Sequence, residues 1–225
     1  MWRIQSGGAA LLLMALVRPV HAEVPSVLGG KLLPSGTSGH HFGIGLPSLF
    51  YEWWNGGDQF DWALHAGLVY EDWSGHFSDV DVGLDLEAPM RFHLAQRGAA
   101  DVALRFAPGV LIGDHDHGRF DRGGDNLLIG LRPELGVLVG IQLSDMVNLI
   151  TGGVVPFTIL IDDHDAGNDV FVVVPLMPRV GVEVQPFEAL VPWALLEIGP
   201  TVIFGGGDSD VDAGVRFWLG VTWYP

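Results

Sequence analysis

Carboxylate and imidazole side chains gather in four short polar segments of this sequence. Residues 71–79, 114–125, 162–169 and 208–212 contain 14 of the 27 acidic residues, four of the nine histidines and only two basic residues. Dense carboxylates suit hard cations such as Ca²⁺, and added imidazole shifts the preference toward Zn²⁺, Ni²⁺ or Cu²⁺. The candidate metal ligands are Asp114, His115, Asp116, His117, Asp162, Asp163, His164, Asp165, Asp208, Asp210 and Asp212.

The last of these segments shows how specific the metal signal is. Asp208, Asp210 and Asp212 match the first three ligand positions of a calcium-binding loop, but Ala213 and Leu219 stand where that loop has glycine and glutamate. The alternative is a solvated acidic rim that binds no particular ion. The chain has no cysteine, which excludes thiolate metal sites. Beyond a divalent cation such as Ca²⁺ at these segments, we predict no cofactor.

A second set of charged residues lies at alternate positions inside apolar segments. We expect these side chains to form one ion-paired network, because the planar guanidinium of arginine pairs carboxylates in two-pronged fashion. Asp61 and Asp85 also occupy alternate positions within apolar segments. The predicted network consists of Glu87, Arg91, Arg105, Arg132, Glu134, Arg179, Glu183, Glu197 and Arg216.

One pair of residues could support nucleophilic catalysis. His76 and Ser78 lie two residues apart, and Asp79 or Asp81 could orient the histidine. Such catalysis needs base and hydroxyl within hydrogen-bond reach, which this spacing alone does not supply. The sequence also lacks the Gly-x-Ser-x-Gly and His-Glu-x-x-His motifs. We therefore predict that the chain is not an enzyme.

The elements that position these residues are β-strands, because apolar residues recur with a period of two. Between residues 78 and 94, the even positions are mostly apolar and the odd positions mostly polar or glycine. The same alternation recurs in residues 60–70, 102–112, 127–141, 170–184, 194–204 and 213–223. Residues 146–161 are apolar on both faces, and their glycines, proline and β-branched residues favour a strand over a helix. Residues 41–53 change face near Leu46-Pro47, which indicates a bulge or kink.

The strands are expected to cross a membrane. Most run 11–17 residues, longer than the usual 5–6 of soluble strands, and a tilted membrane strand needs about 9–11. Short connections at 96–100, 142–145 and 185–189 alternate with longer polar ones, and aromatic residues gather near strand ends. The alternative is a soluble β-sandwich. Since lipid requires closed backbone hydrogen bonding, we predict an all-β, antiparallel, up-and-down transmembrane β-barrel.

The chain resembles the small outer-membrane barrels of Gram-negative bacteria, such as the membrane domains of OmpA and OmpX. A more specific mark is the last strand, Phe217-x-Leu219-x-Val221-x-Trp223-Tyr224, which ends in aromatic residues. The resemblance implies residence in the outer membrane, with membrane lipid, lipopolysaccharide and the outer-membrane assembly machinery as partners. Family members usually end on phenylalanine, whereas this chain ends Tyr224-Pro225.

Ten strands are favoured, with eight as the alternative. Nine segments show clear alternation, and an even number requires one more strand before Ser35. Residues 27–33 are the only candidate. The barrel is expected to comprise residues 23–225. Residues 1–22 are predicted to be a signal peptide, with Arg3, an apolar run too short to span a bilayer, and the cleavage sequence Val20-His21-Ala22.

These features point to a barrel whose function lies either in its loops or in its lumen. The formal net charge of −16 opposes nucleic-acid binding, which depends on neutralising phosphates. We favour a charged, occluded lumen and acidic outer loops, with a structural or surface-interaction role. A narrow ion-selective pore or transport barrel is the alternative, and an outer-membrane lipid hydrolase is a remote one. A lumen filled by side chains for structural reasons alone also fits the charged set.

Overall fold

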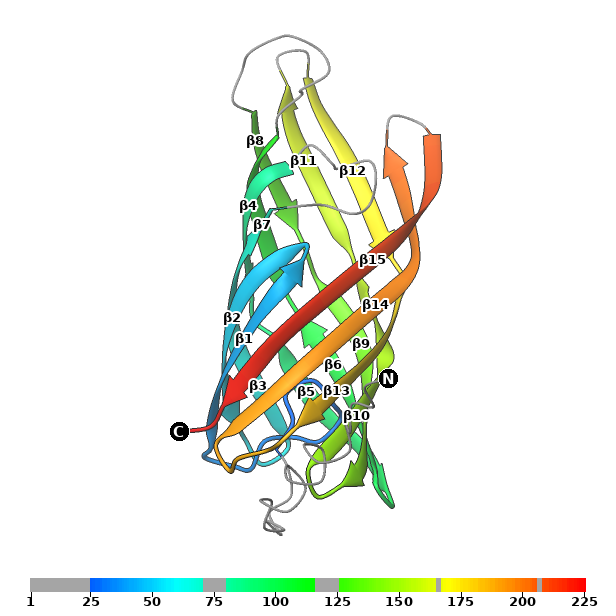
Figure 1. The fold of residues 1–225 in the computed structure, drawn as a ribbon. Coiled ribbons are helices and arrows are strands. Elements are labelled where there is room, and N and C mark those ends of the chain that lie inside the picture. The colour runs from blue at the N-terminus through cyan, green and yellow to red at the C-terminus, as the bar shows by residue number, and fades with distance from the viewer. Residues whose placement is uncertain (1–24, 71–79, 116–125, 165–166, 206–207) are drawn as a thin grey trace, which may run out of the picture.

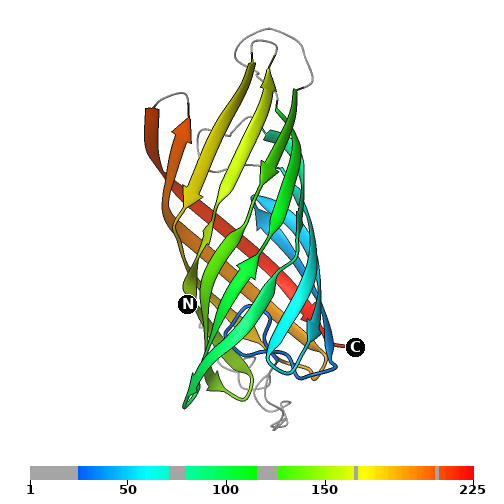
Figure 2. The ribbon, with the colours of Figure 1, turned by 180° about the vertical axis from the view of Figure 1, so that it is seen from behind.

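The described strands form one closed antiparallel barrel (Figures 1 and 2). The computed structural model describes residues 25–70, 80–115, 126–164, 167–205 and 208–225. The strands are β1 (Ser38–Leu46), β2 (Ser48–Gly56), β3 (Phe60–Val69), β4 (Val80–Glu87), β5 (Met90–Arg97), β6 (Ala100–Ala107), β7 (Gly109–His115), β8 (Asn126–Leu131), β9 (Glu134–Ser144), β10 (Val147–Pro156), β11 (Thr158–His164), β12 (Gly167–Pro175), β13 (Met177–Val184), β14 (Leu190–Gly205) and β15 (Asp208–Trp223). No helix of the described residues is long and apolar enough to span a membrane.

Pairing between the first and last strands closes the ring. β1 pairs with β15 from His40↔Trp223 to Leu46↔Phe217. Two further pairings, β12–β14 and β3–β5, join the remaining edges of the sheet. The predicted all-β, up-and-down barrel is therefore confirmed as the fold class. The predicted signal peptide, residues 1–22, lies outside the described residues.

The described residues form fifteen strands, which differs from the predicted ten. Five of the predicted strands are each divided into two halves, β4/β5, β6/β7, β8/β9, β10/β11 and β12/β13, by one or two residues. A proline lies at or beside each break, and proline cannot donate to the ladder of backbone hydrogen bonds. Its carbonyl can still accept: Ala88 N donates to Pro108 O at 2.9 Å, and Phe157 N donates to Pro133 O at 2.7 Å. The two halves of each divided strand follow one another along the wall, so the barrel wall consists of ten passes of the chain.

Two sequence-based assignments near the N-terminus are wrong. Residues 27–33 form no strand, and strand pairing around the ring is complete without them. They lie inside the barrel, where Val27, Leu28 and Leu33 are buried. The segment 41–53 is not one kinked strand. It turns at Leu46-Pro47-Ser48 and forms the β1–β2 hairpin, whose register runs from Ile44↔Leu49 to Ser38↔Asn55. The face change read as a kink is the reversal of the chain.

The outer surface of the barrel is apolar. Large hydrophobic side chains are exposed on every part of the wall, with Leu64 52%, Leu84 44%, Leu104 38%, Leu135 56% and Leu219 49% exposed. In water such a surface would be strongly unfavourable, whereas facing lipid tails it is the expected one. Aromatic side chains at strand ends are also exposed, namely Phe60, Trp62, Tyr70 and Trp223. The sequence also places Trp54 and Trp193 among the aromatic residues near strand ends, but both are buried in the lumen and do not face lipid.

Candidate functional site in the barrel lumen

The N-terminal segment Ser26–Leu33 enters the lumen at the end that carries the short turns and the C-terminus (Figure 1). Val27, Leu28 and Leu33 are buried there against Trp54 and other lumen residues. The backbone of the segment has no strand partners, so its polar groups need partners on the barrel wall. Two buried carboxylates and one buried arginine supply them.

Arg91 and Asp61 hold one side of this N-terminal segment. Arg91 Nε donates to Asp61 Oδ1 at 3.0 Å, and Arg91 Nη1 donates to the carbonyl of Gly29 at 2.9 Å. Leu33 N donates to the other oxygen of Asp61 at 3.1 Å. The guanidinium carbon also lies 4.6 Å from the ring centre of Trp54. Both charged side chains are fully buried, so each depends on the other for its compensation.

Glu183 holds the opposite side of the segment. Leu28 N donates to Glu183 Oε1 at 3.2 Å, and Asn148 Nδ2 donates to Glu183 Oε2 at 2.8 Å. Glu183 is fully buried in β13 and faces Asn148 of β10. Arg91 and Glu183, which were predicted to join one charge network across the barrel, instead bind the N-terminal segment.

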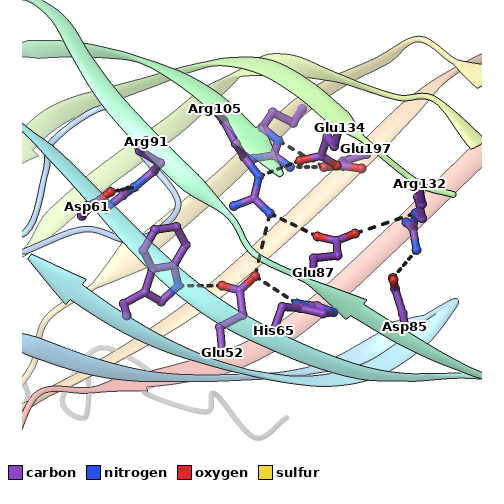
Figure 3. A network of polar contacts seen from close by, with 12 residues as sticks. Glu52, Asp61, His65, Asp85, Glu87, Arg91, Arg105, Arg132, Glu134 and Glu197 are labelled. Atoms are coloured by element: carbon purple, nitrogen blue, oxygen red, sulfur yellow. Dashed lines mark hydrogen bonds and ion pairs between the residues drawn. The ribbon is translucent and has the colours of Figure 1, made fainter. Parts of the chain in front are cut away.

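A second group of charges crosses the middle of the lumen, with Arg105 at its centre (Figure 3). Arg105 Nε donates to Glu134 Oε1 at 2.6 Å. Arg105 Nη2 lies 3.8 Å from a carboxylate oxygen of Glu52 and 3.8 Å from one of Glu87. Arg132 joins the group through Glu87, 3.8 Å from its Nε, and through a short hydrogen bond to Asp85. Four strands, β2, β4, β6 and β9, and the residue after β8 contribute to this network.

A third group of charges lies beside the Arg105 group. Arg179 Nε donates to Glu197 Oε1 at 3.1 Å, and its Nη2 makes a short ion pair with the same oxygen. Arg216 Nη1 lies 3.7 Å from Glu197 Oε2. The nine predicted network residues therefore all face the lumen, but they divide into three groups rather than one.

Four adjacent strands place histidine and glutamate alternately at one level of the lumen. The register pairs His41 with Glu52, Glu52 with His65, and His65 with Glu87. His65 Nδ1 lies 3.1 Å from Glu52 Oε1, and Trp54 Nε1 donates to Glu52 Oε2 at 2.7 Å. Glu52 thus joins the histidine row to the Arg105 group.

A cavity of about 90 Å³ lies between these groups. Val27 and Leu28 of the N-terminal segment form part of its wall, together with Phe50, Leu195 and Trp218. A water molecule needs roughly 10–15 Å³ of such space, so the cavity has room for several. The polar lining residues are His41, Ser48, Glu52, His65, Asp85, Glu87, Arg105, Arg132, Glu134, Arg179, Glu197 and Arg216.

The predicted metal ligands are only partly covered by the structure. Asp116, His117 and Asp165 lie outside the described residues. Asp114 and His115 end β7, Asp162, Asp163 and His164 end β11, and Asp208, Asp210 and Asp212 begin β15. All of these strand ends lie at the end of the barrel opposite the short turns and the C-terminus, here called the loop end (Figure 1). In the parts of the chain that the structure describes, no three metal-ligating side chains come together. His76, Ser78 and Asp79 also fall outside the described residues.

Glu52, His41 and the N-terminal segment are site components that sequence reasoning missed. Restarting the alternation at Ser48 would have placed Phe50, Glu52 and Trp54 on one face, but this requires a turn at Leu46-Pro47. Apart from the apolar character of Val27 and Leu28, nothing in the sequence indicated that these two residues would be buried.

The chain is similar to known proteins in structure but not in sequence. No family model matches the chain, and neither does any curated protein sequence. Among solved structures, the chain is similar to the outer membrane protease OmpT from Escherichia coli, with 10% sequence identity and a TM-score of 0.38. The match covers 85% of this chain and 94% of that one. The barrel fold of this chain rests on its own strand pairing, and it agrees with the resemblance inferred from the sequence.

This comparison corrects the prediction that the chain is not an enzyme. The similar structure is that of a protease. Absence of the two sequence motifs was therefore an insufficient reason for the exclusion, because a barrel assembles its lumen and rim from residues far apart in sequence. The exclusion is withdrawn, and the likeness itself, which is one of fold, assigns no activity.

Proposed function

We propose that this protein is an outer-membrane barrel with an occluded lumen, and that it acts through its acidic loop end in a structural or surface-interaction role. The N-terminal segment Ser26–Leu33 carries the proposal. Three of its backbone groups bond to Asp61, Arg91 and Glu183 on three different strands. A segment held by buried charges on two opposite sides does not leave the lumen easily, since breaking each contact would leave a buried charge without its partner.

Beyond this segment, the Arg105 and Glu197 groups narrow the lumen further. Their carboxylates and guanidinium groups are at most 17% exposed, as expected for side chains that fill the barrel rather than line a wide aqueous channel. At the loop end the sequence is strongly acidic. Such a rim fits divalent cations and the lipopolysaccharide that these ions cross-link, and it disfavours nucleic acid.

Conductance across planar bilayers tests the proposal. The refolded chain without residues 1–22 is expected to insert without opening a steady channel. A variant that also lacks residues 23–33 is expected to open more often than the intact barrel, because it loses one of the two obstructions in the lumen. Folding of both proteins is checked by the faster migration of unheated barrels on a cold gel. Steady conductance by the intact barrel in most insertions would refute the occluded lumen.

A narrow ion-selective pore is the second candidate, favoured by the charged lining of the cavity. Ion pairs that exchange partners would open and close such a path. The same recordings distinguish the two functions, since a pore requires channel openings from the intact protein. Selectivity between K⁺ and Cl⁻ would then show whether acidic or basic lumen charges face the ions.

A further inference from the structure

Two buried polar atoms at the lumen cavity have no hydrogen-bond partner among the described residues. One is Nε2 of His41, a fully buried side chain, and the other is Oδ1 of Asp85, which is 4% exposed as a residue. Both residues line the cavity. Leaving a buried acceptor without a hydrogen bond is unfavourable, and more so when the acceptor is charged, so a ligand with hydrogen-bond donors would be stabilised here.

The two atoms are held in place by their neighbours. His41 Nδ1 lies 2.7 Å from Thr222 Oγ1, and its ring stacks on Trp193 at 4.5 Å. The other oxygen of Asp85 accepts from Arg132. When His41 Nδ1 donates to Thr222, Nε2 becomes an acceptor, and then both free atoms accept. Each of these acceptors, taken separately, would bind a hydrogen-bond donor and not an anion.

The lining of the cavity favours positive charge. Five acids and four arginines line it, which leaves one excess negative charge when the histidines are neutral. Phe50 and Trp218 add aromatic faces, which attract cations. The acidic segments at the loop end also raise the local concentration of cations outside the barrel.

From these observations we propose that the lumen cavity binds a small organic ammonium ion that carries N–H donors. A cavity of ~150 Å³ accommodates benzene, with its six heavy atoms, so about 90 Å³ suits three or four. Ethylammonium, with three heavy atoms, is the matching probe. This binding site goes beyond the proposed occluded lumen, and it shares with that proposal the N-terminal segment, whose Val27 and Leu28 form part of the cavity wall.

Ligand-observed NMR with the refolded barrel in neutral detergent tests this site. At constant ionic strength set with NaCl, ethylammonium is expected to bind saturably with a dissociation constant on the order of 1 mM. Tetramethylammonium is expected not to bind, because it is larger and has no N–H donor. Asp85→Asn is expected to weaken binding by about tenfold or more, since it removes a charge-assisted hydrogen bond.

Asp212→Asn is the matched control, because it removes the same charge at the loop end and Asp212 does not line the cavity. It is expected to change the dissociation constant by less than about twofold, as a solvated charge is screened by salt. His41→Gln is a second test should Asp85→Asn fail the cold-gel folding check, and it is also expected to weaken binding. Three outcomes would overturn the proposal: no saturable binding, equal binding of tetramethylammonium, or equal losses in Asp85→Asn and Asp212→Asn. Channel openings by the intact barrel would refute the occluded lumen but would leave this result unaffected.

Discussion

Replacing Arg91 with methionine is expected to loosen the N-terminal segment from the lumen. The substitution keeps much of the side-chain volume but removes the donors to Asp61 and to the carbonyl of Gly29. It also removes the cation that lies 4.6 Å from the ring centre of Trp54. Asp61, which is fully buried, would keep the hydrogen bond from Leu33 N but lose the guanidinium charge that compensates its own. Removing one partner of a buried ion pair costs about 3–5 kcal/mol, and we expect Arg91→Met to lower the free energy of unfolding by this amount.

The measurement is urea unfolding of the barrel in lipid vesicles, followed by tryptophan fluorescence. The double variant Arg91→Met with Asp61→Asn is the control, because it removes both charges while the amide oxygen can still accept from Leu33 N. We expect this double variant to be more stable than Arg91→Met alone by about 1–2 kcal/mol. Trypsin should also cleave after Lys31 faster in Arg91→Met. A loss below about 1 kcal/mol, or a double variant no more stable than the single one, would show that the pair is solvated and does not hold the segment.

Three further substitutions test other parts of the barrel. In Gly30→Ala the added Cβ would overlap the backbone carbonyl of Asp101, so we expect the N-terminal segment to move and channel openings in planar bilayers to become frequent. A barrel that stays closed would argue against close packing of this segment. Leu84→Arg places a charge on a lipid-facing position and is expected to cost about 2–4 kcal/mol near the bilayer midplane, seen as a smaller folded fraction on cold gels. Trp54→Phe removes the 2.7 Å hydrogen bond to Glu52 and is expected to lower the free energy of unfolding in urea by about 1.5–3 kcal/mol. An unchanged free energy of unfolding would show that water can replace the indole donor.

Alternation alone predicts which face of each strand meets lipid. In β4, Val82, Leu84 and Leu86 are exposed while Gly83 and Asp85 are buried, as a period of two requires. The alternation continues through the proline breaks, because a missing N–H removes one ladder hydrogen bond without reversing the pleat. This is why five interrupted strands could be read as continuous from the sequence, and why their division into halves could not.

Partners of the lumen charges could not be predicted in the same way. Arg132 bonds to Asp85, 47 residues earlier, and Arg91 bonds to Asp61, 30 residues earlier. Such pairs depend on strand register and tilt around the ring, which alternation does not specify. The sequence therefore predicted which charges face inward but placed Arg91 and Glu183 in the wrong group, because the segment that they bind was itself taken for a strand.

The misplaced strand and the occluded lumen have a common physical origin. Eight-stranded barrels have interiors just wide enough for side chains to fill, and the interior widens as strands are added. The turn at Leu46-Pro47 supplies two short strands where the sequence was taken to contain one, so residues 27–33 are not needed in the wall. The ring of ten passes then encloses more volume than its charged side chains occupy, as the remaining cavity of about 90 Å³ shows. An apolar stretch such as Val27-Leu28 is stabilised by entering that space, and the buried Asp61, Arg91 and Glu183 satisfy the backbone that it brings with it.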